Sequence, residues 1–323
     1  MPGPRLSVVL PTIGMHDVLR RVLDGLERQD AGADSFELIL AVDAAEPDLA
    51  PVEAAVGERR YAVRRVRGAR PGVSANRNAG RRVARGELVL FIDNDTVPAA
   101  NLVSEHLAWH RRHPDEEVAV LGLVRWAAEV KVTTFMRWLD QGIQFDYPNI
   151  DGTEAGWGRF YSANVSVKRS FAERVGDFEE ERLPYGYEDL DWAYRASKLG
   201  LRVLFNRAAV VDHHREMTLE FWKRRVARIA VSEREFTRLH PELEPWFFGM
   251  FSAAVQEPPA SGRGVRLARW IPRWVPVLGT RVWYSLDVSY RQALAPHFLE
   301  AWDSAANEGP DLAEREAERP PGQ

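Results

Sequence analysis

The stretch GELVLFIDNDTVP, residues 86–98, decides the fold class of this chain. Residues 87–92 (ELVLFI) are almost entirely apolar, and such a short run predicts a strand that is buried on both faces. The strand is followed at once by Asp93, Asn94 and Asp95. In open sheets of parallel strands, ligands bind beyond the carboxyl ends of the strands. We therefore expect these three polar residues at a binding edge of the sheet.

Strands and helices alternate on either side of this stretch. Further strands are expected at residues 6–10 (closed by Pro11), 37–42, 61–66, 118–124 and 202–211. Helices are expected at residues 18–26, at 74–84 with Ser74 as the cap, and at 101–112. This alternation predicts parallel strands joined by right-handed helical crossovers, and therefore an α/β fold. Asp43 follows a strand and belongs to the same binding edge.

The second half of the chain has a less regular pattern. Its expected segments are a glycine-rich loop at 152–160, helices at 188–199 and 218–240, a linker at 253–264, a tryptophan-rich helical segment at 266–300, and a polar, disordered tail from Asp303.

Length and composition exclude several classes of protein. The 323 residues are enough for one large α/β domain with a helical appendage. The net charge of −4 argues against a partner such as nucleic acid, and the absence of cysteine excludes disulfides, thiolate metal ligands and a cysteine nucleophile. No run approaches the roughly 20 apolar residues of a membrane span, and the N-terminus lacks the pattern of a signal peptide. We expect a cytoplasmic chain.

Asp93 and Asp95 place two carboxylates one residue apart at a strand end. Hard oxygen ligands of this kind suit Mg²⁺ or Mn²⁺, especially when substrate phosphates complete the coordination shell. The alternative is a solvated turn in which Asn94 caps the local backbone. The buried strand immediately before the pair favours the metal site.

Two later segments carry further candidate side chains. Glu188 and Asp189 open a helix after a Gly-flanked aromatic loop, where a carboxylate can act as a general base; the alternative is simple complementation of the helix dipole. Asp191 points away from Asp189 and is interpreted as structural. Of the adjacent His213 and His214, at most one is expected to bind a metal, because neighbouring strand residues face opposite ways. His106, His110 and His113 are interpreted as packing or helix-surface residues, since the helix that carries them buries its apolar neighbours.

Residues 70–80 (RPGVSANRNAG) place a Pro-Gly turn before a helix with Arg77 in its first turns. A helix N-terminus with an arginine is a ready anion site, and the alternative is an ordinary capped surface helix.

These segments, in this order, resemble glycosyltransferase family 2. The matching motifs are VVLPT (8–12), VD (42–43), PGVSANRNAG (71–80), GELVLFIDNDTVP (86–98), SANVSVKRSFAERVGDF (162–178), YGYEDLDWAYRASKLG (185–200) and AAVVDHH (208–214). Each motif is modest alone, but seven in the right order over about residues 5–240 form a specific signal. The resemblance implies a GT-A fold: a Rossmann-like, mostly parallel sheet flanked by helices, followed here by a C-terminal helical extension.

The resemblance also implies a division of the chain and a reaction. Residues 1–217 would form the catalytic domain, with a nucleotide-sugar-binding half at 1–125 and an acceptor-binding half at 126–217; residues 218–302 would form the helical extension and 303–323 the tail. The expected reaction is an inverting transfer of a sugar from a nucleoside diphosphate donor to an acceptor hydroxyl, assisted by Mn²⁺ or Mg²⁺.

The motifs assign roles to individual residues by resemblance. Pro11, Thr12, Asp43, Arg77, Asp93, Asn94 and Asp95 are expected on the donor side, Asp95 and His213 at the metal, and Glu188 and Asp189 at the acceptor, with Asp189 as the general base. Trp157, Phe160 and Tyr161 are expected to stack on the acceptor sugar, or else to pack in the core beneath the loop.

Two departures from the family pattern leave the nucleotide base open. The segment after Thr12 reads IGMHD rather than a polar Tyr-Asn-Arg-like sequence, and Asp43 is followed by two alanines. The acceptor is likewise open between a glycan, a lipid-linked sugar and a small molecule.

Two alternative functions accompany the main hypothesis, and the role of one C-terminal segment is also open. A sugar-phosphate nucleotidyltransferase needs a Gly-rich basic loop after its first strand, and PTIGMHD is poor for that role. A non-catalytic scaffold would bind a nucleotide-sugar or glycan without turnover. Residues 266–284 (RLARWIPRWVPVLGTRVWY) predict a peripheral contact with the inner face of a membrane, packing on the catalytic domain, or a homodimer contact.

Overall fold

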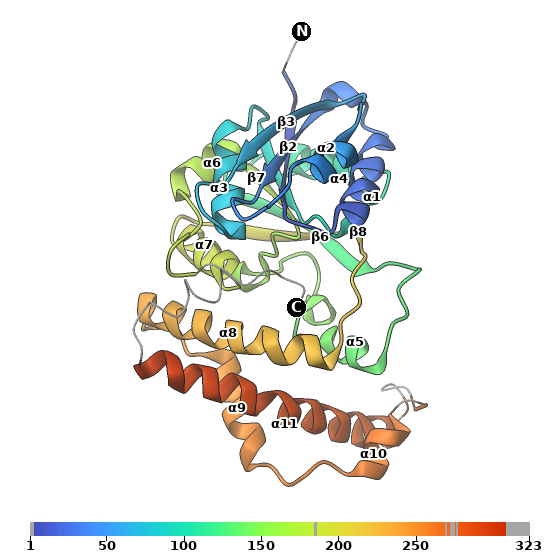
Figure 1. Cartoon of the computed structure of the whole chain (residues 1–323), viewed down its shortest axis with the longest axis vertical. Helices are drawn as coiled ribbons and strands as arrows, with labels where there is room; N and C mark the ends of the chain where they lie inside the picture. Colours follow the sequence, from blue (N-terminus) through green and yellow to red (C-terminus); the bar gives the residue numbers. More distant parts are fainter. Residues whose placement is uncertain (1–2, 184–185, 269, 272–274, 276, 308–323) are drawn as a thin grey trace.

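The computed structural model describes residues 3–183, 186–268, 270–271, 275 and 277–307, and its centre is one eight-stranded sheet (Figure 1). The strand order is β3-β2-β1-β4-β7-β6-β8-β5. The strands are β1 (Leu6–Thr12), β2 (Phe36–Val42), β3 (Ala62–Arg67), β4 (Leu88–Ile92), β5 (Thr96–Pro98), β6 (Val118–Trp126), β7 (Asn164–Lys168) and β8 (Arg202–His213).

The sheet is mostly parallel, as the alternating pattern predicts. β1 pairs in parallel with β2 and with β4, β2 pairs in parallel with β3, and β6 pairs in parallel with β8. Two short strands not expected from the sequence interrupt this order: β7 lies antiparallel between β4 and β6, and β5 lies antiparallel to β8 at the edge. β7 is antiparallel to both β4 and β6, so β6 and its parallel neighbour β8 run in the same direction as β4.

Two element ends differ from the predictions, namely the end of β1 near Pro11 and the start of α3 after Gly72. β1 continues through Pro11 to Thr12, because its ladder with β4 ends at Val9 and the missing amide hydrogen breaks no bond there. Ser74 does not cap the helix: α3 (Val73–Val83) follows Gly72, which has a φ of 121° that favours glycine, and Ser74 is buried inside the first turn.

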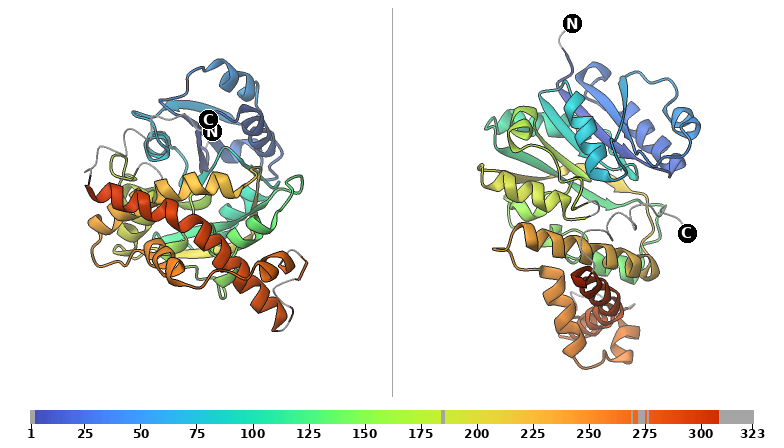
Figure 2. Two further views of the ribbon diagram at one scale, coloured as in Figure 1. Left: turned by 60° about the horizontal axis from the view of Figure 1, so that its bottom comes forward. Right: turned by 60° about the vertical axis from the view of Figure 1, so that its left-hand side comes forward.

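Helices cover the sheet and form a second layer on one side of it (Figures 1 and 2). Those packed around the sheet include α1 (His16–Glu27), α2 (Ala50–Val56), α3, α4 (Leu102–Arg112), α6 (Arg169–Val175) and α7 (Glu188–Ser197). The later helices are α5 (Thr134–Leu139), α8 (Leu219–Leu239), α9 (Trp246–Gln256), α10 (Gly262–Leu267) and α11 (Leu278–Asn307).

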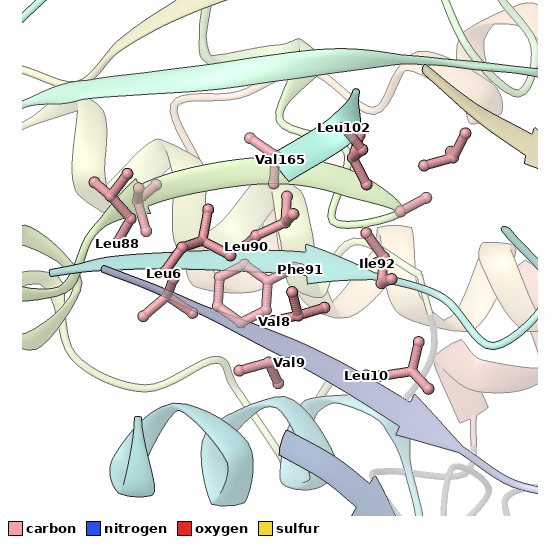
Figure 3. Packing of buried hydrophobic residues seen from close by; sticks show 14 of the residues in the cluster. Leu6, Val8, Val9, Leu10, Leu88, Leu90, Phe91, Ile92, Leu102 and Val165 are labelled. Atoms are coloured by element: carbon pink, nitrogen blue, oxygen red, sulfur yellow. The ribbon is translucent and has the colours of Figure 1, made fainter. Parts of the chain in front are cut away.

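The main core lies where β1 and β4 run side by side. Figure 3 shows their leucine, valine and phenylalanine side chains filling the space around the two strands, and all residues of β1 and β4 are buried. A Cβ added at Gly80 would lie 2.5 Å from Cγ1 of Val9, so glycine lets α3 approach β1 closely. This close packing fixes the helix that carries Arg77 against the central strand.

A second core holds the C-terminal layer together. Trp138 of α5, Trp222 of α8, Phe251 of α9 and Phe298 of α11 are all buried in it. The predicted linker at 253–264 is therefore partly helical, because α9 extends to Gln256 and α10 begins at Gly262.

The predicted tail also begins too early. Residues 303–307 belong to α11, while residues 308–323 lie outside the described part of the chain. Within the described residues, no helix is both long enough and apolar enough to cross a membrane.

Candidate active site

One cleft of about 1690 Å³ opens at the carboxyl ends of the parallel strands. Its sheet side includes Thr12 at the end of β1, Asp43 after β2, Asp93 after β4 and His213 of β8. Its opposite side is formed by the start of α7 and by residues of α8 and α9. The cleft therefore lies where the strand-end rule places a ligand.

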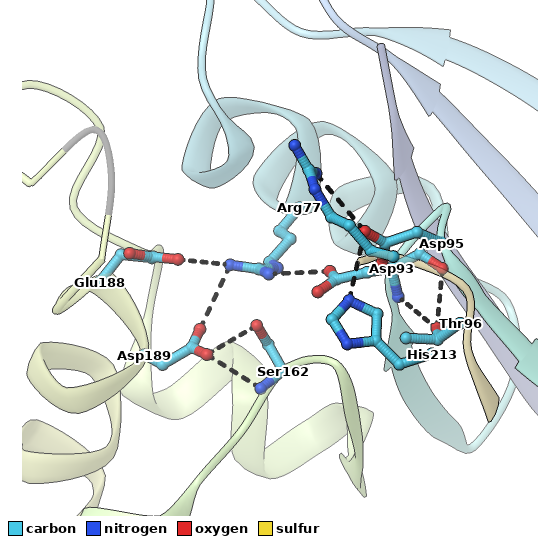
Figure 4. Close-up of polar contacts among 9 residues, drawn as sticks. Arg77, Asp93, Asp95, Thr96, Ser162, Glu188, Asp189 and His213 are labelled. Carbon is cyan, nitrogen blue, oxygen red and sulfur yellow. Dashed lines mark hydrogen bonds and ion pairs between the residues drawn. The ribbon is translucent and has the colours of Figure 1, made fainter. Parts of the chain in front are cut away.

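Arg77 connects the two acidic groups that the sequence separates. Its guanidinium is buried and lies 2.8 Å from Glu188 Oε1, 3.2 Å from Asp189 Oδ1 and 3.2 Å from Asp93 Oδ1 (Figure 4). Burial favours a lower pKa for Arg77, but the charges of the three carboxylates outweigh it and raise the pKa above its usual value. The arginine thus holds a fixed charge at the centre of the site.

Asp189 is held by the loop before β7. Its Oδ2 accepts hydrogen bonds from the Ser162 amide at 2.9 Å and from the Ser162 hydroxyl at 2.7 Å. Burial raises the pKa of Asp189 to about 7 and the charge of Glu188 adds to this, while Arg77 and Ser162 oppose it. A carboxylate with this pKa can accept a proton near neutral pH.

Asp93, Asn94 and Asp95 form a tight turn between β4 and β5. The Asp93 amide donates to Thr96 Oγ1 at 3.1 Å, and the Asn94 side chain donates to Thr12 Oγ1 and to the Ile13 carbonyl, each at 3.3 Å. The turn therefore fastens the ends of β1 and β4 together and leaves the two aspartates on the cleft side.

Asp95 lies beside two basic groups. His213 Nε2 is 3.4 Å and the Arg215 guanidinium 3.5 Å from Asp95 Oδ2. The β5–β8 ladder causes this, since it pairs Thr96 with His213. Burial alone would raise the pKa of Asp95, but His213 and Arg215 lower it below its usual range. The pKa of Asp93 is instead raised, because burial outweighs the opposing charge of Arg77.

The residues present can hold part of a divalent metal shell. Within the described residues, no group of three or more His, Asp or Glu side chains converges as in a closed metal site. Asp95 and His213 form a pair, in which the buried ring of His213 turns its Nε2 toward Asp95 Oδ2. Mg²⁺ sites commonly use one or two protein ligands and complete the shell with substrate phosphates and water, so this pair fits a cation that arrives with a phosphorylated ligand.

Asp43 fastens the start of α3 to the end of β2. Its carboxylate accepts hydrogen bonds from the Gly72 amide at 2.9 Å, the Asn76 side chain at 2.6 Å and the Ala45 amide at 2.8 Å. Asp43, Pro11 and Thr12 all line the cleft. Their contact with a nucleotide stays a prediction.

Of the three aromatic residues expected either at the acceptor or in the core, Phe160 packs in the core, and its assignment to the acceptor is corrected. Its ring is fully buried and stacks on Trp192 with centroids 4.8 Å apart, so it cannot stack on a sugar. Trp157 is half-buried against Tyr194, and Tyr161 packs edge-on against Phe145. Both Trp157 and Tyr161 border the cleft, and their role at a sugar stays a prediction.

Comparison with known proteins finds similarity to glycosyltransferases. Residues 7–161 match the profile described as Glycosyl transferase family 2. Over these residues, slightly less than half of the chain, the sequence is similar to glycosyltransferase family 2. The chain is also 26% identical over 287 residues to validoxylamine A glucosyltransferase of Streptomyces hygroscopicus subsp. limoneus, covering 77% of this chain and 60% of that protein. It is 26% identical over 256 residues to the uncharacterized glycosyltransferase YfnE of Bacillus subtilis, covering 65% of this chain and 64% of that protein. The chain thus spans less than two thirds of the length of these curated relatives.

Solved structures show the same fold. The mannosyltransferase PcManGT of Pyrobaculum calidifontis, in complex with GDP-Man and Mn²⁺, superimposes with a TM-score of 0.54 at 18% identity, covering 98% of this chain and 79% of that one. The S. aureus TarS 1–349 fragment in complex with UDP gives a TM-score of 0.51 at 16% identity, covering 94% of this chain and 91% of that one. The GT-A fold expected from the sequence is therefore confirmed.

The structure confirms the structural interpretations of Asp191, His106 and His110. Asp191 binds Arg195 at 2.9 Å and His240 at 2.8 Å, away from the cleft lining. His106 and His110 are buried and bind the Ser166 hydroxyl at 2.7 and 2.9 Å. Burial lowers the pKa of His106 to about 4, so it remains neutral.

Sequence reasoning missed three residues that shape the site. Ser162 holds Asp189, Arg215 faces Asp95, and Glu233 of α8 accepts a hydrogen bond from the Tyr187 hydroxyl. Ser162 is the first residue of the motif at 162–178, and Arg215 directly follows the motif at 208–214, so their positions could have pointed to the site. Glu233 had none, because it lies in a charged helix among many similar residues.

Proposed function

We propose that the chain transfers a sugar from a nucleoside diphosphate donor to an acceptor hydroxyl, with inversion at the anomeric carbon and with the help of a divalent cation. The observation that carries this proposal is the meeting of the Asp93–Asp95 turn and the Glu188–Asp189 pair across Arg77 in one cleft. One acidic group lies at the strand ends, where a nucleotide binds in this class of fold, and the other faces it from α7.

On the donor side, the diphosphate would lie beside Asp95 and Arg215. Mn²⁺ or Mg²⁺ bound by Asp95 and His213 would neutralise the charge that develops on the departing diphosphate. Arg215 adds a fixed positive charge 3.5 Å from Asp95 Oδ2. Asp93, which Arg77 contacts at 3.2 Å, would bind the sugar or the ribose of the donor.

On the acceptor side, Asp189 would accept the proton of the attacking hydroxyl. The acceptor oxygen forms a bond to the anomeric carbon while the bond from that carbon to the diphosphate oxygen breaks, and the proton passes to the Asp189 carboxylate. A single displacement from the opposite face inverts the configuration. Ser162 and Arg77 hold the carboxylate in place, and its pKa of about 7 suits this role.

The acceptor would occupy the part of the cleft between Trp157, Tyr161 and α8. We propose a carbohydrate, a lipid-linked sugar or a small molecule with a free hydroxyl. A non-catalytic scaffold is the second candidate, and the arrangement of Asp189 with its raised pKa argues against it, because a binding module has no need of a base.

The first experiment is a thermal-shift series with nucleoside diphosphates and nucleotide-sugars, each with and without Mn²⁺. Binding to the folded chain stabilises it by mass action, and a ligand at about 100 times its Kd should raise the Tm by about 5 °C. We expect a metal-dependent shift for one nucleotide base, and its loss in Asp95→Asn.

Asp212→Asn is the matched control, since Asp212 is the neighbour of His213 but binds Arg125 outside the cleft. It should keep the full metal-dependent shift. An absence of any shift with every nucleotide, in the presence of metal, would contradict the proposed donor site. Pyrophosphate release from a nucleoside triphosphate would instead support a nucleotidyltransferase.

A further inference from the structure

The segment 258–286 differs in charge from the rest of the chain. It contains five arginines and no lysine, aspartate or glutamate, within a chain whose net charge is −4. The acids that border it, Glu257 and Asp287, are both bound to Arg291, at 2.7 and 2.8 Å. In the described residues of the segment, Arg263, Arg266 and Arg281 are exposed. The segment therefore presents positive charge that its bordering acids do not neutralise.

The same segment exposes large apolar side chains. Nine such side chains are exposed among the described residues, and five of them lie between Leu267 and Tyr284. Trp270 is 83% exposed and Val277 is 67% exposed. Single exposed apolar residues are ordinary, but a concentration of them rimmed by charge marks an interaction surface.

This surface belongs to a packed corner of the molecule. Ala268 of the α10 end packs on Val282 and Leu286 of α11, and the Trp283 indole donates a hydrogen bond to the Ile271 carbonyl at 2.9 Å. Figures 1 and 2 show α10 and the start of α11 side by side, at the end of the molecule farthest from the sheet. None of these residues lines the active-site cleft. We call the described residues 263–284 the basic corner.

We propose that the basic corner binds an anionic lipid surface. Tryptophan and tyrosine side chains suit the boundary between headgroups and acyl chains, and arginines attract anionic headgroups. A second copy of the chain fits less well, because a two-fold contact through this corner would bring the arginines of both copies together. The surface is separate from the proposed glycosyl transfer and does not depend on it.

The test is flotation of the full chain with vesicles of phosphatidylcholine alone or of phosphatidylcholine mixed with phosphatidylglycerol. We expect binding to the mixed vesicles, little binding to the neutral ones, and a loss of binding as salt is raised. The double variant Arg266→Glu with Arg281→Glu should lower the partition coefficient at least ten-fold. Trp270→Ser should lower it several-fold while leaving its salt dependence in place.

Matched controls on the catalytic domain are Arg111→Glu on α4 and the exposed Leu199→Ser, which should bind as the unmodified chain does. All substitutions lie at exposed positions, and a thermal melt of each variant verifies folding. Equal binding to neutral vesicles, equal loss in the control variants, or no binding at low salt would overturn the proposal. So would a dimer in sedimentation velocity that Trp270→Ser dissociates, without vesicle binding.

Discussion

The two sides of the cleft are held in place by different parts of the molecule. On the sheet side, Asp93 and Asp95 directly follow β4, and the backbone ladder between β5 and β8 brings His213 beside Asp95. On the helical side, Asp189 depends on side chains from elsewhere, since Ser162 lies before β7 and Arg77 lies on α3. Backbone pairing fixes the first group, and side-chain contacts fix the second.

This difference has a consequence for substitution. Main-chain pairing in the sheet survives the loss of one side chain, so the Asp93–Asp95 turn should keep its shape when a single residue of it is changed. The helical side has no such frame, because Tyr187 and the start of α7 are connected to α8 through the side chain of Glu233. We therefore expect changes on the helical side to alter geometry as well as chemistry.

The largest expected effect comes from Asp189→Asn, which removes the proposed base and keeps its shape. We expect kcat to fall by about 1000-fold, because general base catalysis contributes on this order. Donor binding, measured by the metal-dependent thermal shift, should be unchanged, since the sheet side is fixed independently. Asp191→Asn is the control for a neighbouring buried acid outside the cleft, and its kcat should change far less. Near-normal turnover of Asp189→Asn would contradict the assignment.

Arg77→Met tests the group that joins the two sides. Removing one partner of a buried ion pair costs about 3 kcal/mol or more of stability, because charges are left buried and unpaired. Here three carboxylates lose their shared cation, so unfolding by denaturant should show a loss of this size. Arg81→Met is the matched control one turn along α3, where the partner Asp177 is partly exposed. An equal loss in both variants would show that Arg77 is only a helix-packing residue.

The sequence predicts the sheet side of the cleft better than the helical side. The apolar strand β4 and the rule for strand ends were enough to place Asp93 and Asp95, because that inference needs only local sequence. The partners of Asp189 could not be predicted. Ser162 lies 27 positions and Arg77 lies 112 positions before Asp189 in the sequence, so only the folded chain brings them to it.

The burial of β7 and of Phe160 could not be predicted, because each depends on residues that are distant in the sequence. β7 (NVSVK) is short and carries Asn164 and Ser166 on one face, which is typical of an exposed strand or a loop. In the fold, His106 binds both residues, so the polar face is buried. For Phe160 the sequence left a contact with a sugar and packing in the core both open, and only the position of Trp192 shows that its ring is buried in the core.

The dependence of kcat/KM and of stability on pH tests the role of Asp189 on the helical side of the cleft. In the free chain its pKa is raised to about 7 by burial, so log kcat/KM should rise by about one per pH unit below 7 and level off above it. The contribution of Asp189 to the free energy of unfolding should instead fall as the pH rises. The folded chain binds this proton more tightly than the unfolded chain, so the contribution of Asp189 is full below about pH 4 and is lost as the pH rises through about 7. Thermal melts of the unmodified chain and Asp189→Asn across this range isolate the contribution, and an identical pH dependence in both would exclude it.

The smallest expected effect concerns Glu233, which we infer to be a positioning residue for the helical side. It is fully buried, accepts a hydrogen bond from the Tyr187 hydroxyl, and accepts the Phe247 and Phe248 amides of α9, each at 2.8 Å. Tyr187 immediately precedes Glu188 and has a φ of 67°, which a tyrosine adopts only when its surroundings hold it there.

Glu233→Gln keeps the shape but weakens these bonds, and we expect kcat to fall about five-fold, which corresponds to about 1 kcal/mol for one hydrogen bond. KM for the donor should stay unchanged, because Glu233 does not touch the sheet side. Tyr187→Phe removes the other end of the same bond, so the double variant should be no slower than the slower single variant. If the two effects add fully, or if KM for the donor rises with either substitution, Glu233 acts on folding alone and the helical side is held by Ser162 and Arg77 without it.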